Sequence, residues 1–370
     1  MKRIFTSIVL AAFCVFSASA QLEDGFYRVK NNKTKRYISI ADNNPKHYTV
    51  SQSGSTALLG IRTLKNFDRV SCSPSTIIYV KNMDRSKSLY DLQGQGTGIY
   101  ALSGNMILAK LEGGGTSYKA SGTYSGVTIS IADLADDGQR DEAWLANNSE
   151  ETARWNFIKV DTDTNYIGIK PDVKTDDGYY GTIYAGFAFK FVSSGMKAYY
   201  VKSASGKSFE MKEITGTIPA NMPVIIKCAS DNPAENMIMP VLEDIAKLSG
   251  NKLAGVYSAI KYKNSNMTAF TASTMRVLGV SDGKLAFVKK APEEYFYEGK
   301  YLPANKAYLK VKSSDGDVMT IGGSGIVTVT ADPVDASKEG IYTLTGTRLP
   351  DNAPLRPGIY IKDGKKIVIK

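Results

Sequence analysis

The sequence predicts an all-β protein divided into several small domains. Its 370 residues include 33 glycines and 22 tyrosines, and many short apolar runs are separated by polar turn segments. Tyrosine favours strands, and short apolar runs bounded by glycine, proline, asparagine or aspartate are typical of strands rather than helices. A chain of this length is expected to form about two or three domains.

Two Pro-Ala-Asn corners organise the middle of the chain. Ile218-Pro219-Ala220-Asn221 leads into Val224-Ile225-Ile226, and Leu302-Pro303-Ala304-Asn305 leads into Ala307-Tyr308-Leu309. A turn of this composition followed by an apolar run predicts a buried strand. We therefore predict a β-rich, sandwich-like domain over residues 162–324.

Two further elements are predicted inside this domain. Residues 277–288 contain two apolar runs joined through Asp282-Gly283, a pair that favours the tight turn of a β-hairpin. Residues 241–248 place apolar side chains three positions apart and are followed by Gly250, which predicts one short helix.

The N-terminal part, residues 21–161, carries a weak internal repeat. Ile38-Ser39-Ile40-Ala41-Asp42 recurs unchanged as Ile129-Ser130-Ile131-Ala132-Asp133, and the separation is twice a period of roughly 45 residues. Ser88-Leu89-Tyr90-Asp91-Leu92 lies near the midpoint as a degenerate middle copy. Three similar β units predict a three-fold barrel, whose closed sheet has no exposed edge.

The same residues carry a family resemblance. Tyr27-Arg28-Val29-Lys30-Asn31, running to Arg36-Tyr37-Ile38-Ser39-Ile40, resembles the opening of a ricin-type β-trefoil repeat. Trp155-Asn156-Phe157-Ile158 resembles the end of such a domain. The chain departs from the family at its glutamine-x-tryptophan signature, because Ala153 occupies the glutamine position. The resemblance therefore implies a β-trefoil-like fold more strongly than it implies sugar binding.

The resemblance also implies a candidate sugar site in the second repeat, formed by Tyr90, Asp91 and Tyr100. Asp91 matches the family's binding aspartate best, and it would accept hydrogen bonds from sugar hydroxyls. A tyrosine ring would cover the apolar face of the sugar. Asp42 and Asp133 are weaker matches. Aspartates in turns commonly bond to their own backbone, so a structural role for Asp91 is the alternative.

Residues 325–370 predict a short C-terminal β segment. Its three apolar stretches are Ile341–Leu349, Pro357–Ile361 and Gly364–Lys370. They resemble the C-terminal sorting domain that directs Bacteroidota proteins through type IX secretion to the cell surface. The resemblance implies the secretion machinery as a partner, and an ordinary pair of C-terminal hairpins is the alternative.

The N-terminus predicts export. Residues 2–16 combine a basic start with an apolar stretch, and Ser17–Ala20 form a small-residue cleavage site. This is the pattern of a secretory signal peptide over residues 1–20, so the mature chain would begin at Gln21. No later stretch approaches the roughly 20 apolar residues of a transmembrane helix. We expect a secreted protein on the outer cell surface, with no transmembrane span.

The charge pattern argues against nucleic-acid binding. The net charge is +10 with the signal peptide and, without Lys2 and Arg3, falls to +8 from 44 basic and 36 acidic residues. These charges are interspersed along the chain, whereas a nucleic-acid surface would cluster them on one face. We predict no nucleic-acid partner.

Few residues offer catalytic or metal chemistry. The single histidine, His47, cannot by itself supply a catalytic triad or a zinc site. Cys72 and Cys228 have no base nearby in sequence and are expected to be buried free thiols. Asp136-Asp137-Gly138 with Asp141-Glu142 lacks the EF-hand spacing, although a calcium loop is a second interpretation. We therefore predict no catalytic residue, no metal and no cofactor.

Together these features predict a non-catalytic binding protein that recognises a glycan or glycoprotein. A structural or adhesin-like envelope component that binds protein is the alternative. A glycoside hydrolase is disfavoured, because adjacent carboxylates such as Asp176-Asp177 and Glu293-Glu294 lie in predicted loops, where acids are usually solvated. The glycan assignment rests on analogy between folds.

Overall fold

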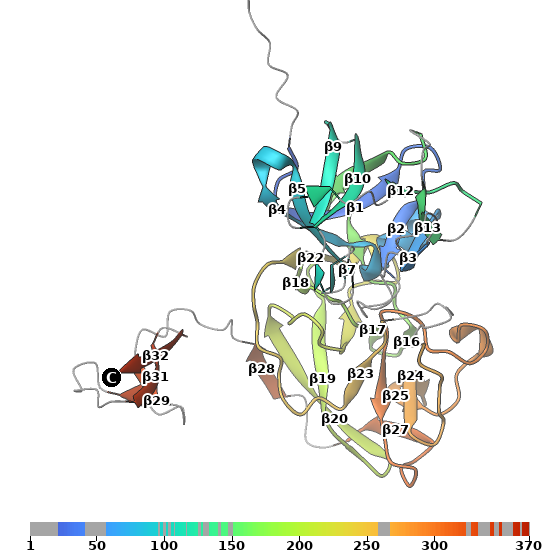
Figure 1. Ribbon diagram of the computed structural model, residues 1–370. Coiled ribbons are helices and arrows are strands. Elements are labelled where there is room, and N and C mark those ends of the chain that lie inside the picture. Colours follow the sequence, from blue (N-terminus) through green and yellow to red (C-terminus); the bar gives the residue numbers. More distant parts are fainter. Residues whose placement is uncertain are drawn as a thin grey trace, which may run out of the picture.

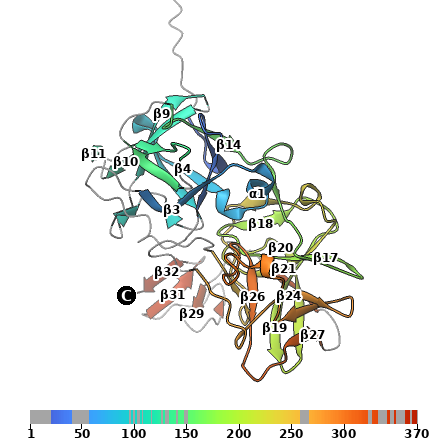
Figure 2. The same ribbon diagram turned by 90° about the vertical axis from the view of Figure 1, so that its right-hand side faces the viewer.

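The structure is a computed structural model, and Figures 1 and 2 show it from two sides. It describes residues 21–40, 57–94, 97–98, 101–102, 105–106, 108–115, 117–124, 127–128, 133–139, 142–146, 151–257, 267–322, 327–331, 341–343, 348–349, 358–362 and 365–369. The predicted signal peptide (residues 1–20), Asp42, His47 and Tyr100 lie outside these ranges. The protein is all-β, as the composition predicts. In the described part, no helix is long and apolar enough to cross a membrane.

The N-terminal part forms a closed six-stranded barrel. Each strand pairs antiparallel with the next around the ring, and the last strand returns to the first. In ring order the strands are β1 (Gly25–Asn31), β4 (Ile78–Asp84), β5 (Leu89–Gly94), β9 (Leu108–Gly114), β10 (Ser117–Tyr124) and β14 (Trp155–Lys159). The predicted trefoil-like barrel is thereby confirmed.

Further strands extend this barrel at one side. The sheet continues from β1 through β2 (Tyr37–Ile40), β3 (Ala57–Leu64), β13 (Glu142–Ala146) and β12 (Asp133–Ala135). Four shorter strands complete the part: β6 (Thr97–Gly98), β7 (Ala101–Leu102), β8 (Asn105–Met106) and β11 (Val127–Thr128). Helical turns occur at α1 (Phe67–Ser71), η2 (Pro74–Thr76) and η3 (Arg85–Lys87).

The barrel interior is filled by alternate residues of its strands. Trp155 is fully buried and its indole N–H donates to the carbonyl of Leu134 at 2.9 Å, which satisfies the ring's one polar atom. Trp155 and Phe157 alternate along β14, and both belong to the core. The other core side chains include Tyr27, Val29, Ile38, Ile40, Ile78, Val80, Tyr90, Leu92, Leu111 and Tyr118.

The prediction that Ser88–Leu92 is a middle copy of Ile38–Asp42 is wrong. Ile38–Ile40 lies in β2, outside the six-stranded ring, whereas Leu89–Leu92 lies in β5, a strand of the ring. The two segments are therefore not equivalent in the fold. Their similar sequences arise because both are short buried strands, a condition that selects the same residue types.

The middle part is a curved eleven-stranded sheet covered on one side by a three-stranded sheet. The three-stranded sheet has the order β15 (Ile167–Gly168), β22 (Met237–Val241), β18 (Ala188–Phe191). The large sheet has the order β16 (Val173–Thr175), β17 (Gly178–Ile183), β21 (Val224–Cys228), β19 (Lys197–Ser205), β20 (Ser208–Gly216), β27 (Val318–Ile321), β25 (Lys284–Val288), β24 (Met275–Ser281), β26 (Ala307–Lys310), β23 (Leu253–Gly255). The eleventh strand, β28 (Val327–Ala331), also pairs with β20.

The central strands of this sheet are buried on both faces. Val224 and Ile226 join the apolar cluster under the three-stranded sheet, while Ile225 joins a second cluster on the opposite face. Successive side chains of a strand point to opposite faces, so a strand buried on both faces is apolar throughout. This explains the continuous Val-Ile-Ile run and confirms the sandwich-like layering.

Both Pro-Ala-Asn corners form turns that feed buried strands, as predicted. Asn221 and Asn305 adopt left-handed conformations, with φ of 55° and 59°, which asparagine tolerates better than most residues. Asn221 donates its backbone N–H to Ala185, and Asn305 donates to Val256. Each corner follows a hairpin (β19–β20 or β24–β25) and leads to a strand that pairs with the hairpin's first strand. The middle part therefore contains two copies of one hairpin–corner–strand unit.

The predicted hairpin over residues 277–288 is confirmed. Asp282 and Gly283 have φ of 49° and 71°, which a two-residue turn requires at both central positions. The helix predicted over residues 241–248 is wrong, because Val241 ends β22 and the chain then continues without a helix. In this stretch Ile245 is buried while Leu242 is exposed. The apolar residues therefore do not form one buried face, and a helix is not needed to bring Ile245 into the core.

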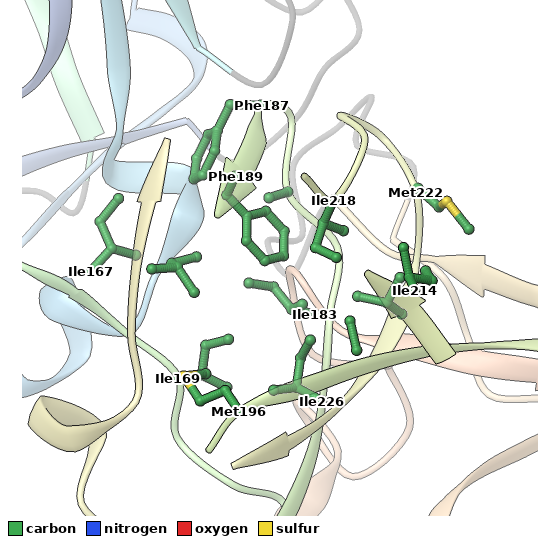
Figure 3. Packing of buried hydrophobic residues seen from close by; sticks show 14 of the residues in the cluster. Ile167, Ile169, Ile183, Phe187, Phe189, Met196, Ile214, Ile218, Met222 and Ile226 are labelled. Atoms are coloured by element: carbon green, nitrogen blue, oxygen red, sulfur yellow. The ribbon is translucent and has the colours of Figure 1, made fainter. Parts of the chain in front are cut away.

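A single apolar cluster joins the barrel to the middle part. It contains Ile77 from the barrel side and Val160 from the connection, together with side chains of β17–β22. Phe26 of β1 packs against Phe187 with ring centroids 6.0 Å apart. Figure 3 shows this cluster between the strands, and both overall views place β18 at the junction. We therefore treat the two parts as packed through a shared core.

The C-terminal segment is also built of strands. β28 (Val327–Ala331) pairs in parallel with β20 and so adds to the middle sheet. A separate four-stranded sheet has the order β30 (Arg348–Leu349), β29 (Ile341–Thr343), β31 (Gly358–Lys362), β32 (Lys365–Ile369). Two further helical turns occur in the middle part, η4 (Pro233–Glu235) and η5 (Glu293–Tyr295).

Candidate ligand-binding site

The sugar site predicted from the family resemblance falls on a barrel strand. Tyr90 is only 1% exposed and belongs to the barrel core, so its ring does not offer a face to a ligand. Asp91 is 4% exposed, and its carboxylate accepts a hydrogen bond from the side-chain amide of Gln93. Tyr100 lies outside the described residues. The stacking role expected for Tyr90 is therefore not supported by its position.

A large concave site lies where the barrel meets the middle part. A cleft of about 1040 Å³ is lined by residues from six separated stretches of the chain. The lining residues lie within 68–74, 166–173, 182–183, 232–233, 278–295 and 304–306. Ligand sites typically have volumes of roughly 300–1,000 Å³ and occur preferentially at domain junctions. The cleft is therefore the strongest candidate site.

The barrel-side wall is formed by two short helical turns. Asn66 caps α1 by accepting the backbone N–H of Asp68 at 2.8 Å, and Pro74 opens the turn η2. Asparagine at the N-cap and proline in the first turn are favoured because the first N–H groups of a helix lack partners inside it. Cys72 lies between the two turns and faces the cleft.

A buried arginine fixes this wall to the connection between the two parts. Arg28 is 0% exposed, and its guanidinium donates to Thr76, to the carbonyls of Val70 and Ser71, and to Asn165 and Tyr166. Burial lowers the pKa of Arg28 to about 10, so it is still charged at neutral pH. Its planar fork of donors suits several acceptors at once. Arg28 thereby positions both segments that line one side of the cleft.

The opposite wall contains a partly buried ion pair. The ammonium of Lys306 lies 2.6 Å from Asp172 Oδ1, and these side chains are 24% and 9% exposed. The other carboxylate oxygen of Asp172 accepts the backbone N–H of Thr182 at 2.8 Å and its hydroxyl at 3.3 Å. Asp172 is thus fully engaged, whereas an ammonium has three N–H donors and Lys306 spends one on Asp172.

A buried hydroxyl without a partner lies in the same wall. Tyr295 ends the turn η5, and its ring packs edge-on against Phe296 with centroids 5.3 Å apart. Its hydroxyl oxygen is buried and makes no hydrogen bond in the structure. Burial, assisted by the charge of Asp172, raises the pKa of Tyr295, so the hydroxyl remains a protonated donor. Buried polar groups are nearly always paired, so this exception calls for an explanation.

Cys72 and Cys228 are free, as predicted, but Cys228 is buried whereas Cys72 is half-buried. Burial raises the pKa of Cys228 to about 12 and also raises that of Cys72. Raised values keep both side chains as neutral thiols, which are poor nucleophiles. Cys72 therefore lines the cleft as a neutral side chain.

Asp136, the first residue of the alternative calcium loop, has a structural partner. It is fully buried, and its carboxylate binds the guanidinium of Arg36 and accepts from the Thr34 hydroxyl. Its Oδ1 also accepts the N–H of Gly138 at 3.1 Å. Within the described ranges, no group of three or more His, Cys, Asp and Glu residues could hold a metal ion.

Comparisons with known proteins add little to this geometry. No protein-family model matches the chain, and no curated protein matches it. Among solved structures, the chain is similar to the crystal structure of a designed three-fold symmetric protein, ThreeFoil. That likeness covers 37% of this chain and 99% of the designed one, with 12% identity and a TM-score of 0.25.

Proposed function

We propose that this protein is a non-catalytic binding protein of the outer cell surface that recognises a glycan or glycoprotein in the cleft at the junction. The observation that carries the proposal is the cleft of about 1040 Å³ at the junction, since ligand sites are concave and occur preferentially at domain junctions.

The ion pair and hydrogen bonds that Asp172 already makes support a binding site rather than a catalytic site. A glycosidase needs two carboxyl groups, one to protonate the leaving group and one to act as base or nucleophile. Asp172 is the buried carboxylate of the cleft, and Lys306 and Thr182 already occupy its oxygens. The other carboxylates that line the described cleft, Asp68 and Glu294, are exposed. Exposed carboxyl groups are solvated, so they lack the environment that tunes a catalytic acid.

A glycan array probed with mature protein tests this function. We expect weak binding to a subset of glycans, with a free energy near −4 kcal/mol per site, which corresponds to roughly millimolar affinity. Presenting the protein on beads should strengthen the signal, because multivalency raises the effective concentration. As a matched control, Asp91→Asn keeps side-chain size and should leave binding unchanged if the cleft is the site. Loss of glycan binding in this variant would instead assign the binding site to the second repeat of the barrel. Binding to envelope proteins without any glycan would favour the structural alternative.

We also propose that the N-terminal segment exports the chain and that the C-terminal segment sorts it to the surface by type IX secretion. Support for the second step comes from strands β29, β31 and β32, which overlap the three apolar stretches that carry the resemblance. In the source cell, we expect mature protein on the surface beginning at Gln21. Deleting residues 340–370 should retain it in the periplasm, as surface proteolysis and fractionation would show. Undiminished surface display of the truncated protein would exclude the sorting role.

A further inference from the structure

We propose that a second pocket, on the outer face of the barrel, binds one uncharged sugar ring at the end of a glycan. This pocket shares no lining residue with the cleft, so the inference adds a site to the one proposed above. It also differs from the site predicted in the second repeat, because its aromatic rings include Tyr79 of β4 and not Tyr90.

Three neighbouring strands of the barrel place a row of side chains on its outer face. Phe26 of β1 pairs with Tyr79 of β4, and Tyr79 pairs with Gln93 of β5. Ile78 and Leu92, which precede Tyr79 and Gln93, belong to the barrel core. Successive side chains of a strand point to opposite faces, so the row points outward. All three side chains of the row are half-buried, which leaves part of each ring and of the carboxamide accessible.

The pocket forms where the middle part meets this row. It has a volume of about 270 Å³ and is lined by the row together with Phe187 and Leu242. The ring centroid of Phe26 lies 5.2 Å from that of Tyr79 and 6.0 Å from that of Phe187, so three aromatic rings gather at one pocket. Small-molecule sites have volumes of roughly 300–1,000 Å³, so this pocket suits a single ring rather than a long chain.

The polar groups of the pocket can both donate and accept. The side-chain amide of Gln93 donates one N–H to Asp91, which leaves a second N–H and the amide oxygen for a ligand. Asp244 also lines the pocket, is exposed, and offers carboxylate oxygens as acceptors. Sugar hydroxyls donate as well as accept, while the C–H groups on one face of the ring pack against an aromatic side chain. This combination favours a sugar over a purely apolar ligand.

The charge of the pocket favours an uncharged sugar. Its described lining residues include the acids Glu243 and Asp244 and no basic residue. Lys190, outside the lining, forms an ion pair with Glu243 and so balances its charge. The charge of Asp244 remains and repels an anionic ligand. A neutral hexose therefore fits this pocket better than an acidic or sulfated one.

Titration of mature protein by saturation-transfer NMR tests the pocket. The probes are the methyl glycosides of glucose, galactose and mannose. We expect at least one of them to bind with a dissociation constant of about 1–10 mM and to receive saturation mainly at the C–H groups of one ring face. Tyr79→Leu should raise that constant about threefold to tenfold, because the aromatic face is lost. Tyr297→Leu is the control: it replaces another solvent-exposed tyrosine, which does not line the pocket, and should leave the affinity unchanged.

A second pair of variants avoids any effect on packing, since Asp244 is exposed. Asp244→Ala should raise the dissociation constant about threefold and leave the midpoint of thermal unfolding unchanged. Asp244→Asn keeps an acceptor, so the neutral glycoside should bind nearly as it does to the wild type. Methyl glucuronide should bind the wild type more weakly than methyl glucoside, and Asp244→Asn should reduce that difference. Equal affinity for the two glycosides in the wild type would contradict the preference for an uncharged ring.

The remaining outcomes separate this pocket from the cleft. If the glycan array is positive but Tyr79→Leu and Asp244→Ala both bind the glycosides like the wild type, the second pocket is wrong and the function proposed for the cleft stands. If the array is empty while a methyl glycoside binds in a Tyr79-dependent way, the second pocket is correct and the cleft proposal is wrong. Decaproline serves as a peptide probe for the aromatic rings, and tighter binding of decaproline than of every glycoside would contradict the sugar assignment.

Discussion

Replacing Arg28 with methionine is expected to lower the free energy of unfolding by about 2–6 kcal/mol, because at least two buried acceptors lose their donor. Methionine fills much of the space but donates no hydrogen bond, so the carbonyl of Tyr166 and the side-chain oxygen of Asn165 would lose their donor. Each buried acceptor left without a partner costs about 1–3 kcal/mol. Urea unfolding followed by tryptophan fluorescence measures the change.

Two variants make the result specific to the geometry of Arg28. Arg28→Lys keeps the charge but not the planar fork, so we expect it to recover only part of the lost stability. Arg69→Met changes an exposed arginine on α1, and its effect should stay within about 0.5 kcal/mol. If Arg28→Met is as stable as the wild type, apolar packing replaces the network. The cleft wall then does not depend on this residue.

Strands and turns were accessible from the sequence because their signals are local. The Asp282-Gly283 hairpin and the asparagines of the two corners were predictable, since positive φ restricts which residues can stand there. Val224-Ile225-Ile226 was recognisable as a buried strand for a similar reason, because burial on both faces removes polar residues. In each case the causes lie within a few positions of the residue concerned.

The candidate site was not accessible because its residues meet only through tertiary structure. Asp172 and Lys306 form an ion pair although they are far apart in the sequence. The residues next to each of them form no motif that would predict this contact. Tyr295 stands beside Glu293-Glu294, which looked like a solvated loop, yet its hydroxyl is buried. The position of the Tyr90-Asp91 pair was also not accessible from the sequence. The likeness of this pair to a family motif does not show that β5 is a strand of the closed ring.

Replacing Phe189 with alanine is expected to destabilise the barrel as well as the middle part. Phe189 is 1% exposed, lies in β18, and exchanges two backbone hydrogen bonds with Ile218, at 2.8 and 3.0 Å. Deleting a buried phenylalanine ring costs about 3–5 kcal/mol, since the transfer energy is lost and a cavity remains. The apolar cluster around it includes Ile77 and Val160, so the loss acts at the junction (Figure 3).

The two tryptophans make the coupling measurable. Trp144 in β13 and Trp155 in β14 both belong to the barrel part, so tryptophan fluorescence reports on that part alone. In Phe189→Ala, the fluorescence midpoint in urea should therefore fall together with the midpoint from circular dichroism, although the substitution lies in the middle part. Val192→Ala, at an exposed position nearby in sequence, should shift neither. A fluorescence midpoint that stays at the wild-type value while the circular dichroism midpoint falls would mean that the barrel unfolds independently. The shared core would then join the parts without coupling their stabilities, and the cleft would lie between two independently stable units.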